Sequence, residues 1–179
     1  MGKETDIPRV LLDEHQVRGR IAEMGAKISQ DYSQKDLALI AMLKGSFVFA
    51  ADLIRSLTIP VTIDMMATSR YESQAGSGVV RITKDLEDSI SGRDVLLVED
   101  IIDSGLTASY LLRILRQRNP ASLEICALLD KSARRIIDLP IAYRGFDIPD
   151  VFVVGYGMDY QQKYRNLPYI GIMRNAYKP

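Results

Sequence analysis

The chain has 179 residues, of which 47% are hydrophobic and 26% are charged, a composition typical of a globular protein with a substantial core. Its 23 basic and 23 acidic residues balance, so overall charge favours neither nucleic acid nor an anionic membrane as a partner. No apolar run approaches the roughly 20 residues that span a bilayer and the N-terminus lacks a signal-peptide hydrophobic region, so we expect a cytoplasmic protein.

The first half of the chain alternates predicted helices with apolar strands. Val17, Ile21, Met24 and Ile28 recur at helical spacing, which predicts an amphipathic helix. The predicted elements are, in order, this helix at 13–32, a strand at 37–43, a helix at 47–57, a strand at 62–68, a polar loop or lid at 69–78, and a short strand at 79–82 that can pair back as a hairpin.

The second half continues the alternation. It holds a predicted strand at 95–98, a helix at 108–118, a strand at 123–129, and last strands at 151–154 and 169–173 with a tyrosine-rich loop between them. Strands alternating with helices predict an α/β protein with an open, mostly parallel sheet flanked by helices. Because no Pro/Gly-rich linker interrupts the chain, we expect one domain over residues 1–179.

One cysteine and one histidine limit the possible chemistry. Cys126 lies in an apolar run and His15 in a charged helical segment, where a buried thiol and a surface position are expected. These counts exclude Cys–His and Ser–His catalysis and zinc sites built on His and Cys. Catalysis must rest on carboxylates, lysines, arginines and backbone groups, with or without a hard metal ion.

Charged residues follow three of the predicted strands. These are Lys44-Gly45, Glu99-Asp100 and Asp130-Lys131. Ligands of open α/β sheets bind outside the carboxyl ends of the strands. The three positions therefore indicate an active site at that edge of the sheet.

The segment 95–107 is the most informative. A strand of four aliphatic residues leads into Glu99 and Asp100, then into the turn Asp103-Ser104-Gly105-Leu106-Thr107 ahead of a helix. Such a turn offers N–H groups, hydroxyls and a helix dipole to a phosphate. Asp103 and Ser104 as plain helix caps are the alternative, but capping leaves two carboxylates at the edge of an apolar strand unexplained.

Residues 98–107, Val-Glu-Asp-Ile-Ile-Asp-Ser-Gly-Leu-Thr, resemble the phosphoribosyl-pyrophosphate signature of the type I phosphoribosyltransferases in its hypoxanthine-guanine form. The resemblance extends from about residue 10 to 173 and includes 43–45, 129–135, 149–160 and 164–167. It implies the fold of that family, with a small hood subdomain. It also implies purine salvage, in which a phosphoribosyl group passes to N9 of hypoxanthine or guanine, giving IMP or GMP and pyrophosphate.

The resemblance also implies roles on the purine side. Asp103 is expected to be the general base, and Lys131 to donate to the 6-oxo group. Phe152 is expected to stack on the purine, Val153 to use its backbone at the exocyclic position, and Asp159 to contact a metal near the base. From the residues alone, a lone lysine after a strand such as Lys131 is normally solvated, and Phe152 can equally be a core aromatic in a strand.

On the phosphoribosyl pyrophosphate side, Lys44, Gly45 and Arg165 are expected to hold the pyrophosphate. Glu99 and Asp100 are expected to hold the ribose hydroxyls or the hydration shell of a Mg²⁺ ion, with Asp159 as the third metal contact. The 5-phosphate is expected to bind the turn residues Asp103, Ser104, Gly105, Leu106 and Thr107.

The family's mobile loop corresponds here to the lid residues Ser69, Arg70 and Tyr71, with Arg70 where a serine is common. The family also implies that the peptide bond before Lys44 can be cis. Its members suggest a homo-oligomer, either a dimer or a tetramer.

Two rival functions share this fold. One is an RNA-binding regulator such as the pyrimidine attenuation proteins, and the other is a nucleotide sensor without turnover. Lys131, Phe152 and Asp159 on the base side and the balanced charge argue against the first. Asp103, Lys131 and Arg165 together argue against the second. The choice among hypoxanthine, guanine and xanthine stays open.

Overall fold

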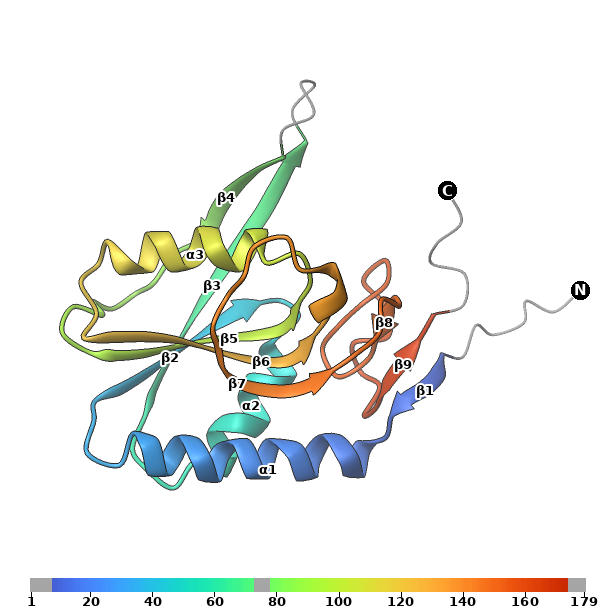
Figure 1. Cartoon of the computed structure of the whole chain (residues 1–179), viewed down its shortest axis with the longest axis horizontal. Helices are drawn as coiled ribbons and strands as arrows, with labels where there is room; N and C mark the ends of the chain where they lie inside the picture. The colour runs from blue at the N-terminus through green and yellow to red at the C-terminus, as the bar shows by residue number, and fades with distance from the viewer. Residues whose placement is uncertain (1–7, 73–77, 174–179) are drawn as a thin grey trace, which may run out of the picture.

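The computed structural model describes residues 8–72 and 78–173, and its centre is a six-stranded sheet (Figure 1). The strand order is β4-β3-β2-β5-β6-β7, in which β4 runs antiparallel to β3 and the other neighbours run parallel. The strands are β2 (Leu37–Leu43), β3 (Thr62–Glu72), β4 (Gly78–Lys84), β5 (Asp94–Ile102), β6 (Ser122–Asp130) and β7 (Ile141–Asp147).

Helices cover both faces of this sheet. Helices α1 (Glu14–Asp31) and α2 (Phe47–Ser56) lie on one face and α3 (Leu106–Arg116) on the other (Figure 1). Two buried clusters follow from this arrangement, one shared with α1 and α2 and the other with α3. Continuous apolar sequences in β2, β5 and β6 suit strands that are buried on both faces.

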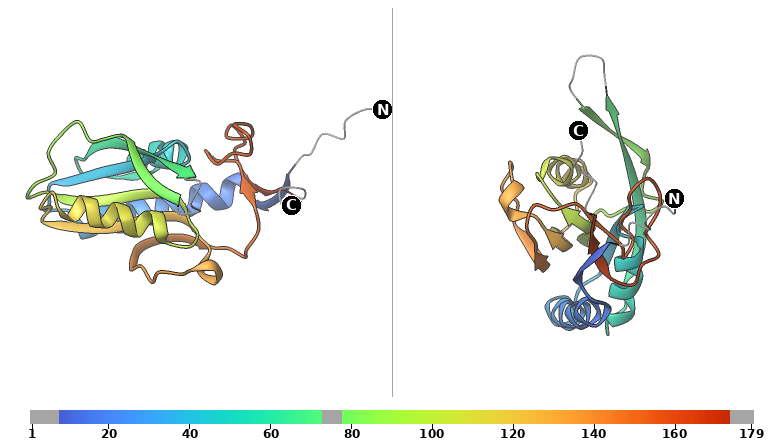
Figure 2. Two further views of the ribbon diagram at one scale, coloured as in Figure 1. Left: turned by 90° about the horizontal axis from the view of Figure 1, so that it is seen from above. Right: turned by 90° about the vertical axis from the view of Figure 1, so that its right-hand side faces the viewer.

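A second, smaller sheet lies beyond one end of the large sheet (Figure 2). It joins β1 (Arg9–Leu12), β9 (Ile170–Ile172) and β8 (Val153–Val154) in that order, with both pairs antiparallel. This sheet and the loop between β8 and β9 form the expected hood. The predicted open, mostly parallel α/β fold is confirmed.

Several predicted boundaries were wrong. The lid at 69–78 is a loop only in part, because β3 continues to Glu72 and β4 begins at Gly78. Strand β5 continues through Glu99 and Asp100 instead of ending at residue 98, and α3 begins at Leu106 instead of 108. Strands β1 and β7 were not predicted at all. None of the helices in the described part of the chain has the length and apolarity to cross a bilayer.

Candidate active site

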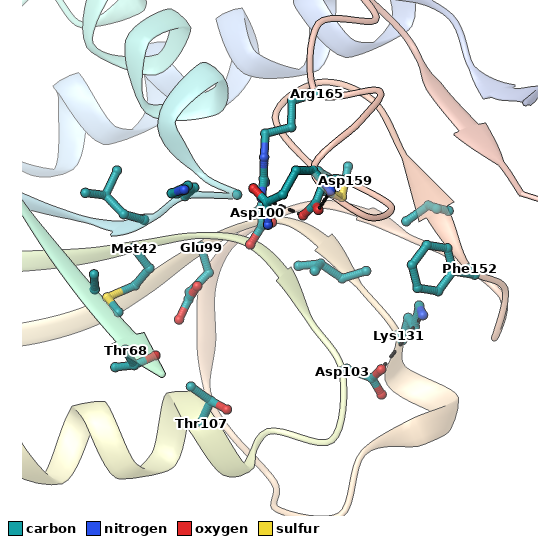
Figure 3. A pocket seen from close by; sticks show the side chains of 18 of the residues that line it. Met42, Thr68, Glu99, Asp100, Asp103, Thr107, Lys131, Phe152, Asp159 and Arg165 are labelled. Atoms are coloured by element: carbon teal, nitrogen blue, oxygen red, sulfur yellow. Dashed lines mark hydrogen bonds and ion pairs between the residues drawn. The ribbon is translucent and has the colours of Figure 1, made fainter. Parts of the chain in front are cut away.

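A cavity of about 680 Å³ opens where β2, β5 and β6 end, between the large sheet and the hood loop (Figure 3). Eleven residues that the sequence predicted for the site line it: Lys44, Gly45, Glu99, Asp100, Asp103, Thr107, Lys131, Phe152, Val153, Asp159 and Arg165. The carboxyl edge of the sheet therefore brings these residues together, as expected of an α/β sheet.

The two carboxylates of β5 are held in an apolar strand. Glu99 is 8% exposed, and burial, with a smaller contribution from Asp100, raises the pKa of Glu99 well above its usual range. Burial also raises the pKa of Asp100 to about 6, although backbone hydrogen bonds and Arg165 act to lower it. Desolvation dominates both shifts because it penalises the charged form. An incoming cation or hydroxyl donor would relieve that penalty.

Gly45 allows the turn after β2 to pass directly beside Asp100. A Cβ atom at residue 45 would lie 1.8 Å from Asp100 Oδ2, and one at Gly157 would lie 2.2 Å from the Gly45 carbonyl oxygen. Both approaches require glycine. The peptide bond between Leu43 and Lys44 is cis, and the Lys44 side chain is exposed.

Asp159 and Arg165 face each other on the hood loop (Figure 3). Arg165 Nη2 lies 2.6 Å from Asp159 Oδ1, and Arg165 Nη1 donates to the Gly157 carbonyl at 2.8 Å. The Gln162 N–H donates to Asp159 Oδ2 at 2.8 Å. Gln162 also lines the cavity and was not predicted. In this arrangement, a carboxylate and a guanidinium lie together on the side of the cavity that Asp100 also faces.

The turn after β5 opens a second cavity of about 230 Å³, lined in part by Asp103, Ser104, Gly105 and Thr107. Gly105 is the N-cap of α3 and has φ of +85°, a left-handed conformation that suits glycine. Gly105 has no side chain that could cap the helix, and the nearest side-chain acceptor is Ser104 Oγ, which accepts from the Leu106 N–H at 3.4 Å. The alternative that Asp103 only caps the helix is therefore wrong.

Asp103 lies at the opposite end of the cavity from Arg165, beside Lys131 (Figure 3). Lys131 is only 5% exposed, and its Nζ lies 3.8 Å from Asp103 Oδ2. A solvated role for this lysine is therefore excluded. Burying an ammonium group is costly without a partner, so this end of the cavity is built to hold a charge pair.

Phe152 borders the same end of the cavity. It precedes β8, so it is not the strand residue that the sequence suggested, and its ring contacts Tyr160 edge-on at 5.7 Å between centroids. Val153 is 6% exposed and pairs with Ile172 in the hood sheet. An aromatic ring beside a lysine and a carboxylate suits a planar, hydrogen-bonding ligand.

Two predicted positions contribute less. Leu106 is exposed at the start of α3 and Ser69 lies on β3, and neither lines the two cavities. The side chains of Arg70 and Tyr71 lie outside the described residues. Among the described residues, no three or more His, Cys, Asp or Glu side chains lie close enough together to hold a metal ion. Glu99, Asp100 and Asp159 therefore do not form a three-carboxylate site.

A buried ionic cluster around Asp130, the residue before Lys131, was not predicted from the sequence. Asp130 is fully buried and pairs with Arg135, which lies five residues further along the chain, and with Arg144 Nε on β7 at 2.9 Å. A charged residue at the end of an apolar strand was the available signal. One of its partners, Arg144, lies on the neighbouring strand β7, which the sequence pattern did not predict.

The fold and this site match a known class of protein. The family model for the phosphoribosyl transferase domain matches residues 10–161. The hypoxanthine-guanine phosphoribosyltransferase of Mycobacterium tuberculosis is 51% identical over 175 residues, which cover 94% of this chain and 87% of that protein. The hypoxanthine phosphoribosyltransferase of Haemophilus influenzae is 51% identical over 170 residues, which cover 90% and 93%.

Solved structures agree with these matches. A crystal structure of a hypoxanthine phosphoribosyltransferase from Staphylococcus aureus has a TM-score of 0.91 at 43% identity, covering 97% of this chain and 96% of that chain. The chain therefore belongs to the phosphoribosyltransferase family, in the branch of the hypoxanthine and hypoxanthine-guanine enzymes.

Proposed function

We propose that this protein is a purine salvage enzyme that transfers the phosphoribosyl group of phosphoribosyl pyrophosphate to N9 of hypoxanthine or guanine. The bond from the anomeric carbon to pyrophosphate breaks, a bond to N9 forms, and the purine loses one proton. The relatives named above support a transferase and not the RNA-binding regulator. The observation that carries the proposal is the Asp103–Lys131 pair beside Phe152, in one cavity with the carboxylates of β5.

Asp103 and Lys131 divide the work at the purine. Asp103 accepts the proton that leaves the imidazole ring, as a general base within reach of its substrate does. Lys131 has three donors and no acceptor, so it binds the 6-oxo oxygen. Phe152 stacks on the ring and Val153 contacts the exocyclic position through its backbone. The support is that all four residues border the same cavity.

The turn residues Ser104, Gly105, Leu106 and Thr107 bind the 5-phosphate. Backbone N–H groups at the start of α3 and the positive end of its dipole attract an anion. The cavity of about 230 Å³ in front of this turn supports that role. It shares Glu99, Asp103 and Thr107 with the larger cavity, so the ribose connects the two.

The pyrophosphate binds at the Arg165 end of the cavity, with Lys44 and the backbone of Gly45. Mg²⁺ favours one or two carboxylates together with substrate phosphates, and Asp100 and Asp159 on this side of the cavity fit that preference. When bound, the ion neutralises the charge of the leaving group. Glu99 and Asp100 hold the ribose hydroxyls.

Four further features belong to the same proposal. Ser69, Arg70 and Tyr71 form a lid that excludes water from the reacting centre. The chain acts as one domain, assembles as a homo-oligomer, and works in the cytoplasm. No nucleic acid or membrane partner is required for this reaction.

The decisive experiment supplies phosphoribosyl pyrophosphate with hypoxanthine, guanine, xanthine or adenine, and follows nucleotide formation. Each reaction is run with Mg²⁺ and again with a chelator. We expect IMP and GMP to form only when the metal is present. An RNA-binding titration at several salt concentrations tests the rival, because phosphate contacts give a steep salt dependence. No turnover with any 6-oxopurine would refute the proposal.

A further inference from the structure

Arg134 lies beside Asp103, in the short 3-10 helix η1 (Ser132–Arg134) that follows Lys131. Its Nε lies 3.3 Å from Asp103 Oδ1 and its Nη1 lies 3.4 Å from Asp150 Oδ1. The guanidinium therefore reaches two carboxylates in two different segments. No role for this arginine follows from the signature sequence.

The two oxygens of Asp103 face different cations. Oδ2 faces Lys131 Nζ at 3.8 Å, and Oδ1 faces Arg134 Nε at 3.3 Å. Within the described part of the chain, Oδ1 is closed to solvent and accepts no hydrogen bond, so its contact with Arg134 is an ion pair without hydrogen-bond geometry. A carboxylate attracted at both oxygens is restrained in its rotation, which fixes the direction of its lone pairs.

Through Asp150, Arg134 also contacts the segment that carries Phe152, the proposed stacking residue. Asp150 lies two residues before Phe152, ahead of β8. Arg134 consequently connects the turn after β5 with the segment that leads into the hood sheet. These are the two segments that a purine would contact with its reacting nitrogen and with its face.

We propose that Arg134 is a positioning residue, which holds the Asp103 carboxylate in the orientation that receives the purine proton. This rests on the proposed function, in which Asp103 is the general base. Arg134 acts through Asp103, and Asp150 holds the outer end of the guanidinium.

The neighbouring Arg135 provides a contrast within the same segment. It pairs with fully buried Asp130, and its Cδ lies where a Cβ at Gly105 would approach to 3.2 Å. Breaking a buried pair leaves an uncompensated charge in the interior. Arg135 therefore secures the fold of this segment, whereas Arg134 is 43% exposed and we expect its replacement to affect folding less.

The test is a double-mutant cycle with steady-state kinetics on hypoxanthine. We expect Arg134→Gln to lower kcat by about 10- to 100-fold, the scale of a misplaced catalytic group, and to leave KM for phosphoribosyl pyrophosphate unchanged. Arg134→Lys should recover part of the rate, because lysine restores the charge without the planar fork. Asp150→Asn should lose less than Arg134→Gln. In an Asp103→Asn background, Arg134→Gln should cause no further loss, since coupled residues are not additive.

Melting temperatures distinguish a loss of Asp103 positioning from a loss of folding stability. Arg134→Gln should melt near the wild type, while Arg135→Gln should melt at a clearly lower temperature. If Arg134→Gln fails to fold, the Arg134→Lys and Asp150→Asn variants complete the cycle. An equal loss with and without the Asp103 carboxylate, or full kcat in the folded Arg134→Gln protein, would overturn the inference alone. A wild type without transferase activity would overturn the proposed function as well.

Discussion

At the scale of single residues, Asp103 occupies a position that a helix cap would not. Its carboxylate points toward Lys131 at the purine end of the cavity, away from the N–H groups of α3 (Figure 3). The residue type and the turn were predictable from the signature. The orientation was not, because it depends on contacts with the segment that follows β6.

Asp103→Asn keeps the size of the side chain and removes the base. We expect kcat to fall by about 10²- to 10⁴-fold, the usual contribution of general acid–base catalysis, while the 5-phosphate turn stays intact. Phosphoribosyl pyrophosphate binding, measured by calorimetry, serves as the control and should persist. Near-normal turnover with an unchanged pH profile would leave Asp103 without a catalytic role.

We expect Lys131 to decide which purines are accepted. An ammonium group satisfies a 6-oxo oxygen, but it meets the 6-amino group of adenine donor to donor. Because this lysine is 5% exposed, an unpaired charge is costly there, and such a mismatch can discriminate by about 10⁴-fold or more. Hypoxanthine and guanine should be substrates and adenine should not.

The measurement for this prediction is kcat/KM for each base. Lys131→Ala should lose rate with the 6-oxopurines far more than it weakens binding of phosphoribosyl pyrophosphate. Comparable kcat/KM values for adenine and hypoxanthine in the unmodified protein would contradict the assignment of Lys131.

At the scale of elements, the strands that carry the site were predictable because they are buried on both faces. The sequences of strands β2, β5 and β6 each contain a long apolar run. Strand β7, at the edge of the sheet, has one buried residue, Tyr143, and mixes the apolar Ile141 and Phe146 with small and charged residues, so its sequence gives little signal. The short β1 pairs with β9 at the far end of the chain, and nothing local specifies that partner.

At Gly45, the turn after β2 approaches Asp100 on β5 very closely. Gly45→Ala would place a methyl group 1.8 Å from Asp100 Oδ2, so either the turn or the carboxylate must move. We expect kcat/KM for phosphoribosyl pyrophosphate to fall by about 10²-fold, as for other small displacements at a reacting centre.

Gly19→Ala on α1 is the matched control for this substitution. A Cβ there would meet no atom within 4 Å, so activity should be unchanged. Stability should rise by roughly 0.5–1 kcal/mol, because glycine is unfavourable inside a helix. Equal kinetics for the two alanine variants would show that the approach at Gly45 has no functional importance.

At the scale of the whole molecule, the hood sheet joins the two ends of the described chain. Strand β1 pairs with β9, and β9 pairs with β8. The loop between β8 and β9, which carries Asp159 and Arg165, is therefore held over the large sheet, and Tyr156 in it donates a hydrogen bond to Asp52 on α2. The resemblance predicted a hood. The Tyr156–Asp52 contact was not predictable, because the two residues are 104 positions apart.

Holding carboxylates in this interior should cost the protein stability. Burial raises the pKa of Asp100 to about 6 in the folded state, against about 3.9 in an unfolded chain. Between these values the folded state binds the proton more tightly, so the contribution of Asp100 to stability declines as the pH rises through this window. Asp100→Asn should therefore be more stable than the wild type at pH 8 by about 1–3 kcal/mol, a range that allows for partial solvent access. The gain should vanish below about pH 3, where the carboxyl is protonated in both states.

Urea unfolding at several pH values measures this difference, and Asp36→Asn provides a control of opposite sign. The side-chain hydrogen bond from Arg93 lowers the pKa of Asp36, so its contribution is present at neutral pH and is lost as the pH falls. Asp36→Asn should be less stable than the wild type at pH 8. If Asp100 also holds Mg²⁺ with phosphoribosyl pyrophosphate, these ligands should raise the melting temperature of the wild type more than that of Asp100→Asn. An Asp100→Asn protein that is no more stable than the wild type at pH 8 would show that the buried carboxylate carries no such cost.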